Sequence, residues 1–504
     1  MPIFFDLPNQ WIAFLVFFSI IMFFIGLAEI ARKVLKLSPE LSRKFVHVMV
    51  GILVSLAPFF LISSTPVILL GVIFTILNYV ALKKDSFKGM HTTERVSFGT
   101  VYFPIAFTLL VIMFWERNIV LFVVAMLILA LSDTAATVVG ERANSNRKFI
   151  LWHDKKSWPG SIAFFLMTLL VVIGAFPIYS KIMNNQPLPL HHLITMAFFT
   201  AAVSTVGEAV SKRGSDNLTL TLTAALGMDL YLSSMNSGML ADMGGWFAVS
   251  MILGYGAYKL KALSVSGGLG AFLLGVFMFG MGSWHTMLPL IGFFVLSSIL
   301  SKIADRPSKK DIISSKGSQR DIVQVYANGG IPLIFTIVWY LTSFSSDWLY
   351  WAFLASLASA TADTWETEIG SFSNSLPLNI LTWKRVPKGF SGGISLLGTL
   401  GGVVGAGIIV SIAAFMGFIQ WDLILIVMII CAGFLGSIMD SILGASIQAK
   451  FQCDVCGKAT ERVSHCHEET KHISGLLWLD NDWVNVAGSL SGGLIFTAAY
   501  FLLL

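Results

Sequence analysis

Apolar runs long enough to cross a lipid bilayer recur along the whole chain. We count about sixteen, and their centres lie near residues 20, 53, 74, 107, 128, 170, 201, 227, 250, 274, 294, 335, 356, 408, 435 and 494. A backbone inside lipid must satisfy its own hydrogen bonds, so such runs form helices. Only 12% of the 504 residues are charged, far below the fraction of a soluble domain. The sequence therefore predicts an all-α, polytopic transmembrane protein with about sixteen membrane-spanning helices.

The basic residues predict how these helices are oriented. They gather after the odd-numbered runs, in segments 32–44, 83–95, 142–156, 212–213, 259–261, 302–320, 384–388 and 450–462. The loops after the even-numbered runs hold almost none, with Arg117 and Lys181 as exceptions. Because basic loops stay in the cytoplasm, we expect both termini outside and the active sites facing the cytoplasm, as in a bacterial inner (plasma) membrane protein. The net charge of +5 reflects this bias and does not indicate a nucleic-acid partner.

The start of the chain favours a membrane anchor over a cleaved signal. Residues 1–10 contain no basic stretch, and the first apolar run has full spanning length. We therefore expect that run to be the first transmembrane helix.

An Asp at the end of an apolar run is followed by a Lys/Gly/Ser loop twice in the chain. Asp133 precedes the loop 155–161, and Asp363 precedes the loop 384–393. In this alignment residues 158–162 match residues 391–395, and runs five to eight match runs thirteen to sixteen. We therefore predict two halves that this alignment relates to each other, a membrane domain over 1–240 and another over 241–504.

A carboxylate in an apolar run is costly unless it has a partner, so it indicates function. Carboxylates bind Mg²⁺, and glycine-rich loops with lysines suit phosphates, so this pattern predicts phosphoryl transfer. In the first half the predicted Mg²⁺ ligands are Asp133, Glu208 and Asp216. The predicted nucleotide contacts are Arg43, Lys44, Lys155, Lys156, Ser157, Gly160 and Asn217, and His47 could contact phosphate or accept the alcohol proton.

Each of these candidates also has a structural interpretation. The Arg–Lys pair could only enforce topology, and His47 could be satisfied by a neighbouring carbonyl group. Glu208 could pair with Lys212 one helical turn later. Asp216 and Asn217 could simply cap the next helix.

The second half carries an analogous set. Its predicted Mg²⁺ ligands are Asp363, Asp440 and Asp482, with Glu366, Asn328 and Asn485 nearby. Its predicted phosphate contacts are Arg320, Lys384, Arg385, Lys388 and the backbone at Gly392.

Cysteine and histidine side chains in the loop 450–472 predict a metal site. Cys453 and Cys456 are separated by two residues, and His465, Cys466 and His467 follow. Three thiolates and one imidazole suit a structural tetrahedral Zn²⁺, with His465 or His467 as the fourth ligand. A reducing cytoplasm argues against a disulfide here.

The first half, over about residues 40–235, resembles the membrane family of phytol kinase and dolichol kinase, which is related to phosphatidate cytidylyltransferases. The motifs are Arg43-Lys44-Phe45-Val46-His47, Gly99-Thr100-Val101-Tyr102-Phe103-Pro104, Asp133-Thr134-Ala135-Ala136 with Gly140, Lys156-Ser157-Trp158-Pro159-Gly160-Ser161, and Glu208 with Gly214-Ser215-Asp216-Asn217-Leu218. The resemblance implies transfer of a phosphoryl group from CTP to an isoprenoid alcohol. Pro159 departs from the family, where Glu is common.

The second half, over about residues 262–504, resembles the phytyl-phosphate kinase family of membrane proteins. The motifs are Ser266-Gly267-Gly268-Leu269-Gly270-Ala271, Arg320-Asp321-Ile322-Val323-Gln324-Val325-Tyr326-Ala327-Asn328-Gly329-Gly330, Thr361-Ala362-Asp363-Thr364-Trp365, Val386-Pro387-Lys388-Gly389 with Ser391-Gly392-Gly393-Ile394, Gly436-Ser437, Asp440-Ser441-Ile442-Leu443-Gly444-Ala445 and Leu479-Asp480-Asn481-Asp482 with Val484-Asn485. The resemblance implies conversion of an isoprenyl monophosphate to the diphosphate.

Together the two halves predict a bifunctional membrane lipid kinase that uses CTP and Mg²⁺. Its predicted partners are isoprenoid alcohols, isoprenyl phosphates, a nucleoside triphosphate and the bilayer, and its oligomeric state is left open. The alternatives are a membrane cytidylyltransferase and a secondary transporter. Carrier acids sit near the bilayer midplane, whereas these acids lie beside lysines at the ends of apolar runs.

Overall fold

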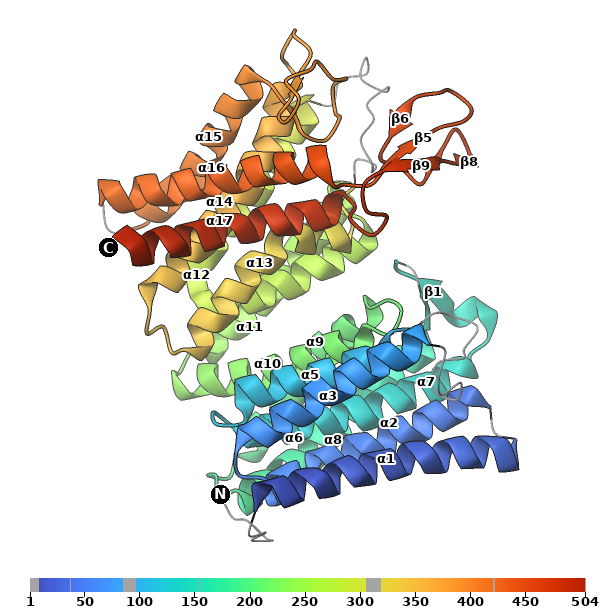
Figure 1. Ribbon diagram of the computed structural model, residues 1–504. Coiled ribbons are helices and arrows are strands. Elements are labelled where there is room, and N and C mark those ends of the chain that lie inside the picture. Colours follow the sequence, from blue (N-terminus) through green and yellow to red (C-terminus); the bar gives the residue numbers. More distant parts are fainter. Residues whose placement is uncertain are drawn as a thin grey trace. The chain divides into compact units, whose positions relative to one another are not determined.

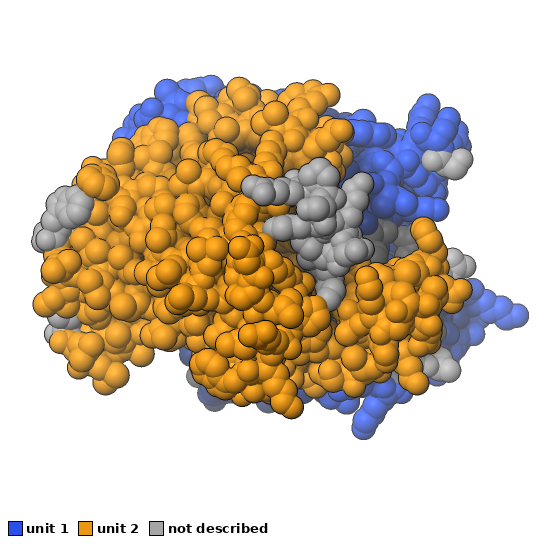
Figure 2. Space-filling view, turned by 90° about the horizontal axis from the view of Figure 1, so that it is seen from above, with its two compact units in different colours: residues 1–244 blue, residues 245–504 orange. Residues whose placement is uncertain are grey.

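The computed structural model describes residues 9–36, 38–84, 97–152, 154–304, 319–419 and 422–503. The chain divides into two compact units, Met1–Gly244 and Gly245–Leu504 (Figure 2). Part of the prediction of membrane orientation and anchoring depends on residues 1–8, 85–96 and 305–318. These residues lie outside the described part of the chain.

The prediction of an all-α polytopic membrane protein is confirmed. The centre of every predicted run falls inside a helical segment, and eleven helices of the described part are long and apolar enough to cross a membrane. The 40-residue helix α12 (Val265–Ala304) holds two of the predicted runs, because its backbone breaks at Ser283 (φ 54°, ψ −149°). The number of spans and the side on which the termini lie stay predictions.

The elements of unit 1 follow one another in a nearly continuous series of helices (Figure 1). They are α1 (Gln10–Leu35), α2 (Pro39–Ser55), η1 (Ala57–Phe59), α3 (Ser64–Lys83), α5 (Gly99–Phe114), α6 (Ile119–Leu127), the π-helix η2 (Ile128–Ser132), α7 (Asp133–Glu141), η3 (Ser145–Arg147), β1 (Lys148–Ile150), β2 (Lys155–Ser157), α8 (Trp158–Ile182), α9 (Leu190–Ala209) and α10 (Asp216–Asn236).

Unit 2 has the same helical character, with more strands between its helices. Its elements are α11 (Leu240–Lys259, which begins just before the division), α12, α13 (Ile322–Leu341), α14 (Asp347–Gly370), β3 (Leu378–Asn379), β4 (Gly393–Ile394), α15 (Leu396–Phe415), α16 (Leu423–Ser446), β5 (Lys450–Gln452), β6 (Ala459–Thr460), β7 (Ser464–His465), β8 (Glu468–Glu469), β9 (Lys471–Ser474) and α17 (Asn481–Leu503).

Each unit is built around one helix that is buried over most of its length. In unit 1 it is α6, which packs against α2, α5, α8 and α10, and in unit 2 it is α14, which packs against α12, α13, α15, α16 and α17. An apolar helix in a membrane can also face lipid, so burial by neighbouring helices is what marks these two as central: residues 119–126 and 352–362 are buried throughout. Both central helices lead directly to one of the two acids of the repeated motif, Asp133 and Asp363.

The strands lie at one end of the helices of their unit (Figure 1). The hairpin β1–β2 leads into α8, and the short pair β3–β4 leads into α15. Between α16 and α17 a three-stranded sheet of order β6-β5-β9 stands beside the hairpin β7–β8. These strands carry or neighbour most of the predicted site loops.

Candidate functional sites

A cavity of about 1170 Å³ lies among the helices of unit 1. Every candidate that the sequence assigns to the first half lines it, although these residues come from distant parts of the chain. They are Arg43, Lys44, His47, Asp133, Lys155, Lys156, Ser157, Gly160, Glu208, Asp216 and Asn217.

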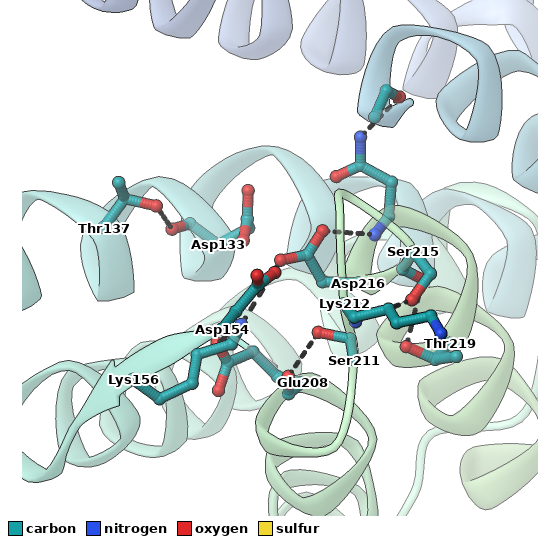
Figure 3. A network of polar contacts seen from close by, with 12 residues as sticks. Asp133, Thr137, Asp154, Lys156, Glu208, Ser211, Lys212, Ser215, Asp216 and Thr219 are labelled. Carbon is teal, nitrogen blue, oxygen red and sulfur yellow. Dashed lines mark hydrogen bonds and ion pairs between the residues drawn. The ribbon is translucent and has the colours of Figure 1, made fainter. Parts of the chain in front are cut away.

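Asp133 enters this cavity because of a local change in helix geometry. The π-helical turn η2 immediately precedes it, and such turns are frequent at functional sites. Asp133 is the first residue of α7 and the first charged residue after the buried helix α6, and its side chain is 20% exposed. Its charge interacts with those of Asp216, Glu208 and Lys156, toward which it lies in Figure 3.

Lys156 of β2 holds two of these acids together (Figure 3). Its Nζ lies 2.5 Å from Oε1 of Glu208, at the end of α9, and 3.3 Å from Oδ2 of Asp216, at the start of α10. Burial alone would lower the pKa of Lys156, but the carboxylates of Glu208 and Asp216 raise it above its ordinary value. The lysine is therefore charged throughout the neutral range. The cation paired with Glu208 is thus Lys156, whereas Lys212 lies 3.8 Å from the ring of Trp152.

The acids of this cavity fit a Mg²⁺ ion. Within the described residues, Oε2 of Glu208 is buried and has no hydrogen-bonding partner. A buried polar atom without a partner costs about 1–3 kcal/mol unless a ligand satisfies it. Together with Asp133 and Asp216 it offers the hard oxygen ligands that Mg²⁺ prefers.

His47 on α2 is held by a carbonyl group, as its structural interpretation anticipated. Its Nε2 lies 2.9 Å from the oxygen of Leu129 and 3.7 Å from Oδ2 of Asp133. A carbonyl oxygen only accepts, so Nε2 carries the proton and Nδ1 is the nitrogen left to accept one. Lys44 pairs with Glu141 at 2.6 Å, whereas Arg43 makes no ion pair with any residue in the described ranges.

The turn before α10 is fixed to the start of α5. The amide of Asn217 donates to the carbonyl oxygen of Gly99 at 2.7 Å, and Gly214 adopts φ +87° beside it. A Cβ on Gly214 would lie 2.4 Å from the Gly99 nitrogen, so the turn requires glycine. Asp154, which the sequence analysis missed, accepts the backbone N–H of Arg213 at 2.7 Å and ties the β1–β2 hairpin to the same turn.

An apolar arm continues the cavity away from these charges. Between Arg43 and Val54 of α2 the residues that line the cavity extend over about 16 Å, given a rise of about 1.5 Å per residue in an α-helix. The side chains that line this part come from α1, α2, α3 and α5, and include Ile21, Ile25, Val50, Val54, Leu70, Phe74 and Phe107. The cavity therefore has a charged head and an apolar tail.

The acids of unit 2 also converge. Asp440 on α16 interacts electrostatically with Asp363 and Glu366 of α14. With its amide oriented to donate, Asn485 Nδ2 lies 3.2 Å from Oδ2 of Asp440. Both carboxylate oxygens of Glu366 are buried without a hydrogen bond of normal geometry among the described residues, although the Thr399 side chain lies near them. Asp482, 5% exposed, lies three residues before Asn485 and so on the same face of α17.

The phosphate candidates of unit 2 are spread more widely. Arg320 interacts with the charge of Glu368, which stands about 140° around α14 from Asp363, and burial lowers the pKa of this arginine. Lys388 donates to the carbonyl of Ser373. Lys384 and Arg385 are exposed, and Asn328 donates to the Gln324 carbonyl of its own helix. The structure does not bring this group together around the acids as it does in unit 1.

Both units repeat one arrangement next to the first acid. In unit 1 the hydroxyl of Ser157 caps α8 at the Gly160 nitrogen (3.2 Å), and a Cβ on Gly160 would lie 2.9 Å from the Ala136 oxygen and 3.2 Å from Gly140 Cα. Ala136 and Gly140 follow Asp133 by three and seven residues.

In unit 2 the hydroxyl of Ser395 caps α15 at the Gly398 nitrogen, also at 3.2 Å. A Cβ on Gly398 would lie 2.8 Å from the Glu366 oxygen and 3.3 Å from Gly370 Cα, and these residues follow Asp363 by three and seven. The equivalent of Ser157 is therefore Ser395. The predicted alignment of residues 158–162 with 391–395 is wrong by five residues, because the capped helix start is repeated and the glycine loop before it is not.

Two family models match separate parts of the chain. Residues 248–493 match the family model described as integral membrane protein DUF92, and residues 3–212 match that of the cytidylyltransferase family. Protein PGR of Arabidopsis thaliana is 33% identical over 266 residues, which cover 48% of this chain and 90% of the relative. The chain belongs to the integral membrane protein DUF92 family.

Two further relatives have names that bear on chemistry or location. A phytol kinase of Synechocystis is 27% identical over 202 residues, which cover 40% of this chain and 82% of the relative. Protein VTE6, chloroplastic, of Arabidopsis thaliana is 25% identical over 240 residues, which cover 47% of this chain and 65% of the relative. The family resemblance predicted for both halves is confirmed. No solved structure matches the chain.

The DUF92 segment also contains the predicted metal ligands. One ligand atom each from Cys453, Cys456, His465 and Cys466 lies within 4.8 Å of the others. His465 Nδ1 is 3.5 Å from Sγ of Cys456 and 3.2 Å from Sγ of Cys466, close to the edges of about 3.5–3.8 Å of a tetrahedral zinc site. Hydrogen bonds from the Cys456 backbone and from His465 lower the pKa of Cys453 to about 6, which favours the thiolate. Of the two histidines considered, His465 is the one in this cluster.

Proposed function

We propose that the chain is a bifunctional membrane lipid kinase. Unit 1 transfers the terminal phosphoryl group of CTP to an isoprenoid alcohol, and unit 2 adds a second phosphoryl group to the product. The observation that carries this proposal is the cavity of unit 1, in which an acid–lysine head and an apolar arm share one space. A long prenyl chain with a hydroxyl end matches that division of polarity.

In unit 1, Asp133, Glu208 and Asp216 would hold Mg²⁺, which neutralises charge on the triphosphate. Lys156 and Arg43 bind the phosphates, and Lys155, Lys44, Ser157, Gly160 and Asn217 line the same cavity. The alcohol oxygen attacks the terminal phosphorus, the bond from this phosphorus to the bridging oxygen breaks and CDP leaves, and the alcohol proton goes to Nδ1 of His47. The hydrogen bond from Nε2 to Leu129 fixes that tautomer and the ring.

In unit 2, Asp363, Asp440 and Asp482 would hold Mg²⁺ together with Glu366, and Asn485 orients Asp440. An acceptor that already carries a phosphate needs more positive charge than an alcohol does. The groups proposed to supply it are the phosphate candidates Arg320, Lys384, Arg385, Lys388 and the backbone at Gly392, and Asn328 is a further candidate. The framework that this unit shares with unit 1 supports the same class of reaction.

The proposal also includes the membrane topology and the metal site. The loops that carry both sites face the cytoplasm, about sixteen helices cross the bilayer, both termini lie outside, and the membrane is a plasma membrane. The cluster of Cys453, Cys456, His465 and Cys466 holds a structural Zn²⁺.

Labelled CTP tests the reaction. Purified protein is incubated with Mg²⁺, a panel of prenols and CTP that carries label at the γ or the α phosphate, and the lipids are analysed by mass spectrometry. We expect γ-label in the lipid and CDP in solution. An α-labelled lipid would identify a cytidylyltransferase, which the family match of residues 3–212 makes the second candidate. Lipid without either label would exclude both.

A further inference from the structure

An acid from the loop that carries the metal ligands contacts the glycine-rich stretch 389–393 of unit 2, which we call the glycine loop. Glu461 lies between β6 and β7, and its Oε1 accepts the backbone N–H of Ser391 at 3.0 Å. Its charge also acts on Asp440 and on Lys450. Burial raises the pKa of Glu461, while the Ser391 hydrogen bonds and Lys450 oppose that change.

The glycine loop is seated on the last turn of α16. Gly392 has φ +79°, and a Cβ there would lie 2.4 Å from that of Ala445, so only glycine allows this approach. Lys450 donates to the Ala445 carbonyl at 3.0 Å and lies 4.8 Å from the centroid of the Phe390 ring. The loop therefore touches α16 on one side and Glu461 on the other.

The metal ligands bracket Glu461 along the chain. Before it, Cys453 N–H donates to the Lys458 carbonyl at 3.0 Å, where β5 and β6 pair. After it, Thr470 donates to the Arg462 carbonyl at 2.6 Å and closes the β7–β8 hairpin that carries His465. Strands of two residues are too short to be stable without further support. A bound metal ion supplies folding free energy to such a module directly.

We propose that the metal-loaded cluster positions Glu461, and that Glu461 in turn fixes the Ser391 amide and the glycine loop. Glu461 is thus a positioning residue, and metal occupancy controls the order of the loop proposed to bind the acceptor phosphate. The phosphate role of that loop rests on the proposed function. The coupling between metal and loop does not.

The test uses the full-length protein in lipid nanodiscs. Zinc content is measured by atomic emission, hydrogen exchange is followed in the peptide that covers residues 386–395, and KM is measured for an isoprenyl monophosphate. Glu461→Ala should keep its zinc, exchange the Ser391 amide about 10- to 100-fold faster and raise KM. Glu461→Gln, whose amide oxygen can still accept, should stay close to the wild type. The control Glu469→Ala changes an exposed acid of the same module.

Zinc removal by a chelator, or the Cys456→Ser substitution, should give the same faster exchange in the wild-type background. Neither should add to the effect of Glu461→Ala, because all three act through one contact. Unchanged exchange after zinc removal, purified protein without zinc, or loss of zinc in Glu461→Ala would each overturn the inference. If the coupling is present but no lipid is phosphorylated, the proposed reaction fails and the inference stands.

Discussion

Replacing Lys156 with methionine removes the cation that pairs with Glu208 and Asp216 and changes the shape of the side chain little. Glu208, with a side chain 6% exposed, would lose the partner that now lies 2.5 Å away. Breaking a buried ion pair by removing one partner destabilises a protein by about 3–5 kcal/mol. At about 2–4 °C per kcal/mol for a chain of 150–250 residues, the unfolding midpoint of unit 1 should fall by about 6–20 °C.

The assay combines thermal unfolding, followed by tryptophan fluorescence, with two activity measurements. Lys156→Met should lose phosphorylation of the alcohol while it still converts supplied isoprenyl monophosphate, which shows that unit 2 is folded. Adding Glu208→Gln should recover about 1–3 kcal/mol relative to the sum of the single changes, without recovering the alcohol step. The matched control is Lys181→Met, which changes an exposed lysine at the end of α8 and should stay within about 0.5 kcal/mol of the wild type.

The pH dependence has a defined sign. Because the pKa of Lys156 is raised in the folded protein, its contribution to stability is complete below the ordinary lysine pKa and is lost only as pH rises through the raised value. Titration of Lys156 itself should therefore contribute no pH dependence to the stability difference between Lys156→Met and the wild type between about pH 6 and 9. If Lys156→Met unfolds at the same temperature as Lys181→Met, the argument from the buried ion pair is refuted.

Three further predictions follow from the same geometry. Asp133→Asn should abolish the alcohol step and spare the monophosphate step, whereas Asp363→Asn should accumulate monophosphate; a folded single mutant that loses both activities would contradict the division of labour. Val54→Trp should fill the end of the apolar arm and shorten the longest prenol accepted, read as a shift in chain-length preference with short-chain activity retained. Gly160→Ala and Gly398→Ala should each reduce activity only in their own unit, by forcing apart two helices whose closest backbone contact is 2.8–2.9 Å from the added carbon.

The sequence features that best predicted the structure were single residues whose burial carries a free-energy cost. A carboxylate inside an apolar run, as at Asp133, needs a partner wherever the helix packs, and the charge of Lys156 acts on it favourably, while Glu208 and Asp216 are further acids of the same cavity. The helical runs could be predicted for the same reason, since lipid leaves a backbone few alternatives.

Features that depend on tertiary contact could not be predicted in this way. Asp154 and Glu461 lie in polar loops, where the sequence indicates no desolvation cost for an acid and the acid therefore does not stand out. Only the fold brings a backbone N–H to each of them. The correct alignment of the two units was missed because glycine-rich loops of different length look alike in sequence. What is repeated is the serine that caps a helix and the glycine three residues after it, as at Ser395 and Gly398.

This register also predicts a difference between the two sites. The position before Ser157 is Lys156, but the position before Ser395 is Ile394, so the repeat does not place a lysine among the acids of unit 2. The charges that act most strongly on Asp440 are those of other acids. Unit 1 thus carries its own counter-charge when empty, whereas unit 2 must obtain it from a bound cation.

Mg²⁺ alone, without nucleotide, should therefore stabilise unit 2 more than unit 1. A ligand at 100 times its Kd adds about 2.7 kcal/mol to the free energy of unfolding. Titrating Mg²⁺ against Asp440→Asn and Asp133→Asn separates the two sites. We expect the Mg²⁺-dependent rise in the unfolding midpoint to disappear in Asp440→Asn and to remain in Asp133→Asn. A rise that depends on Asp133 instead would mean that Lys156 yields its carboxylates to the metal, and the contrast between the two charge arrangements would be wrong.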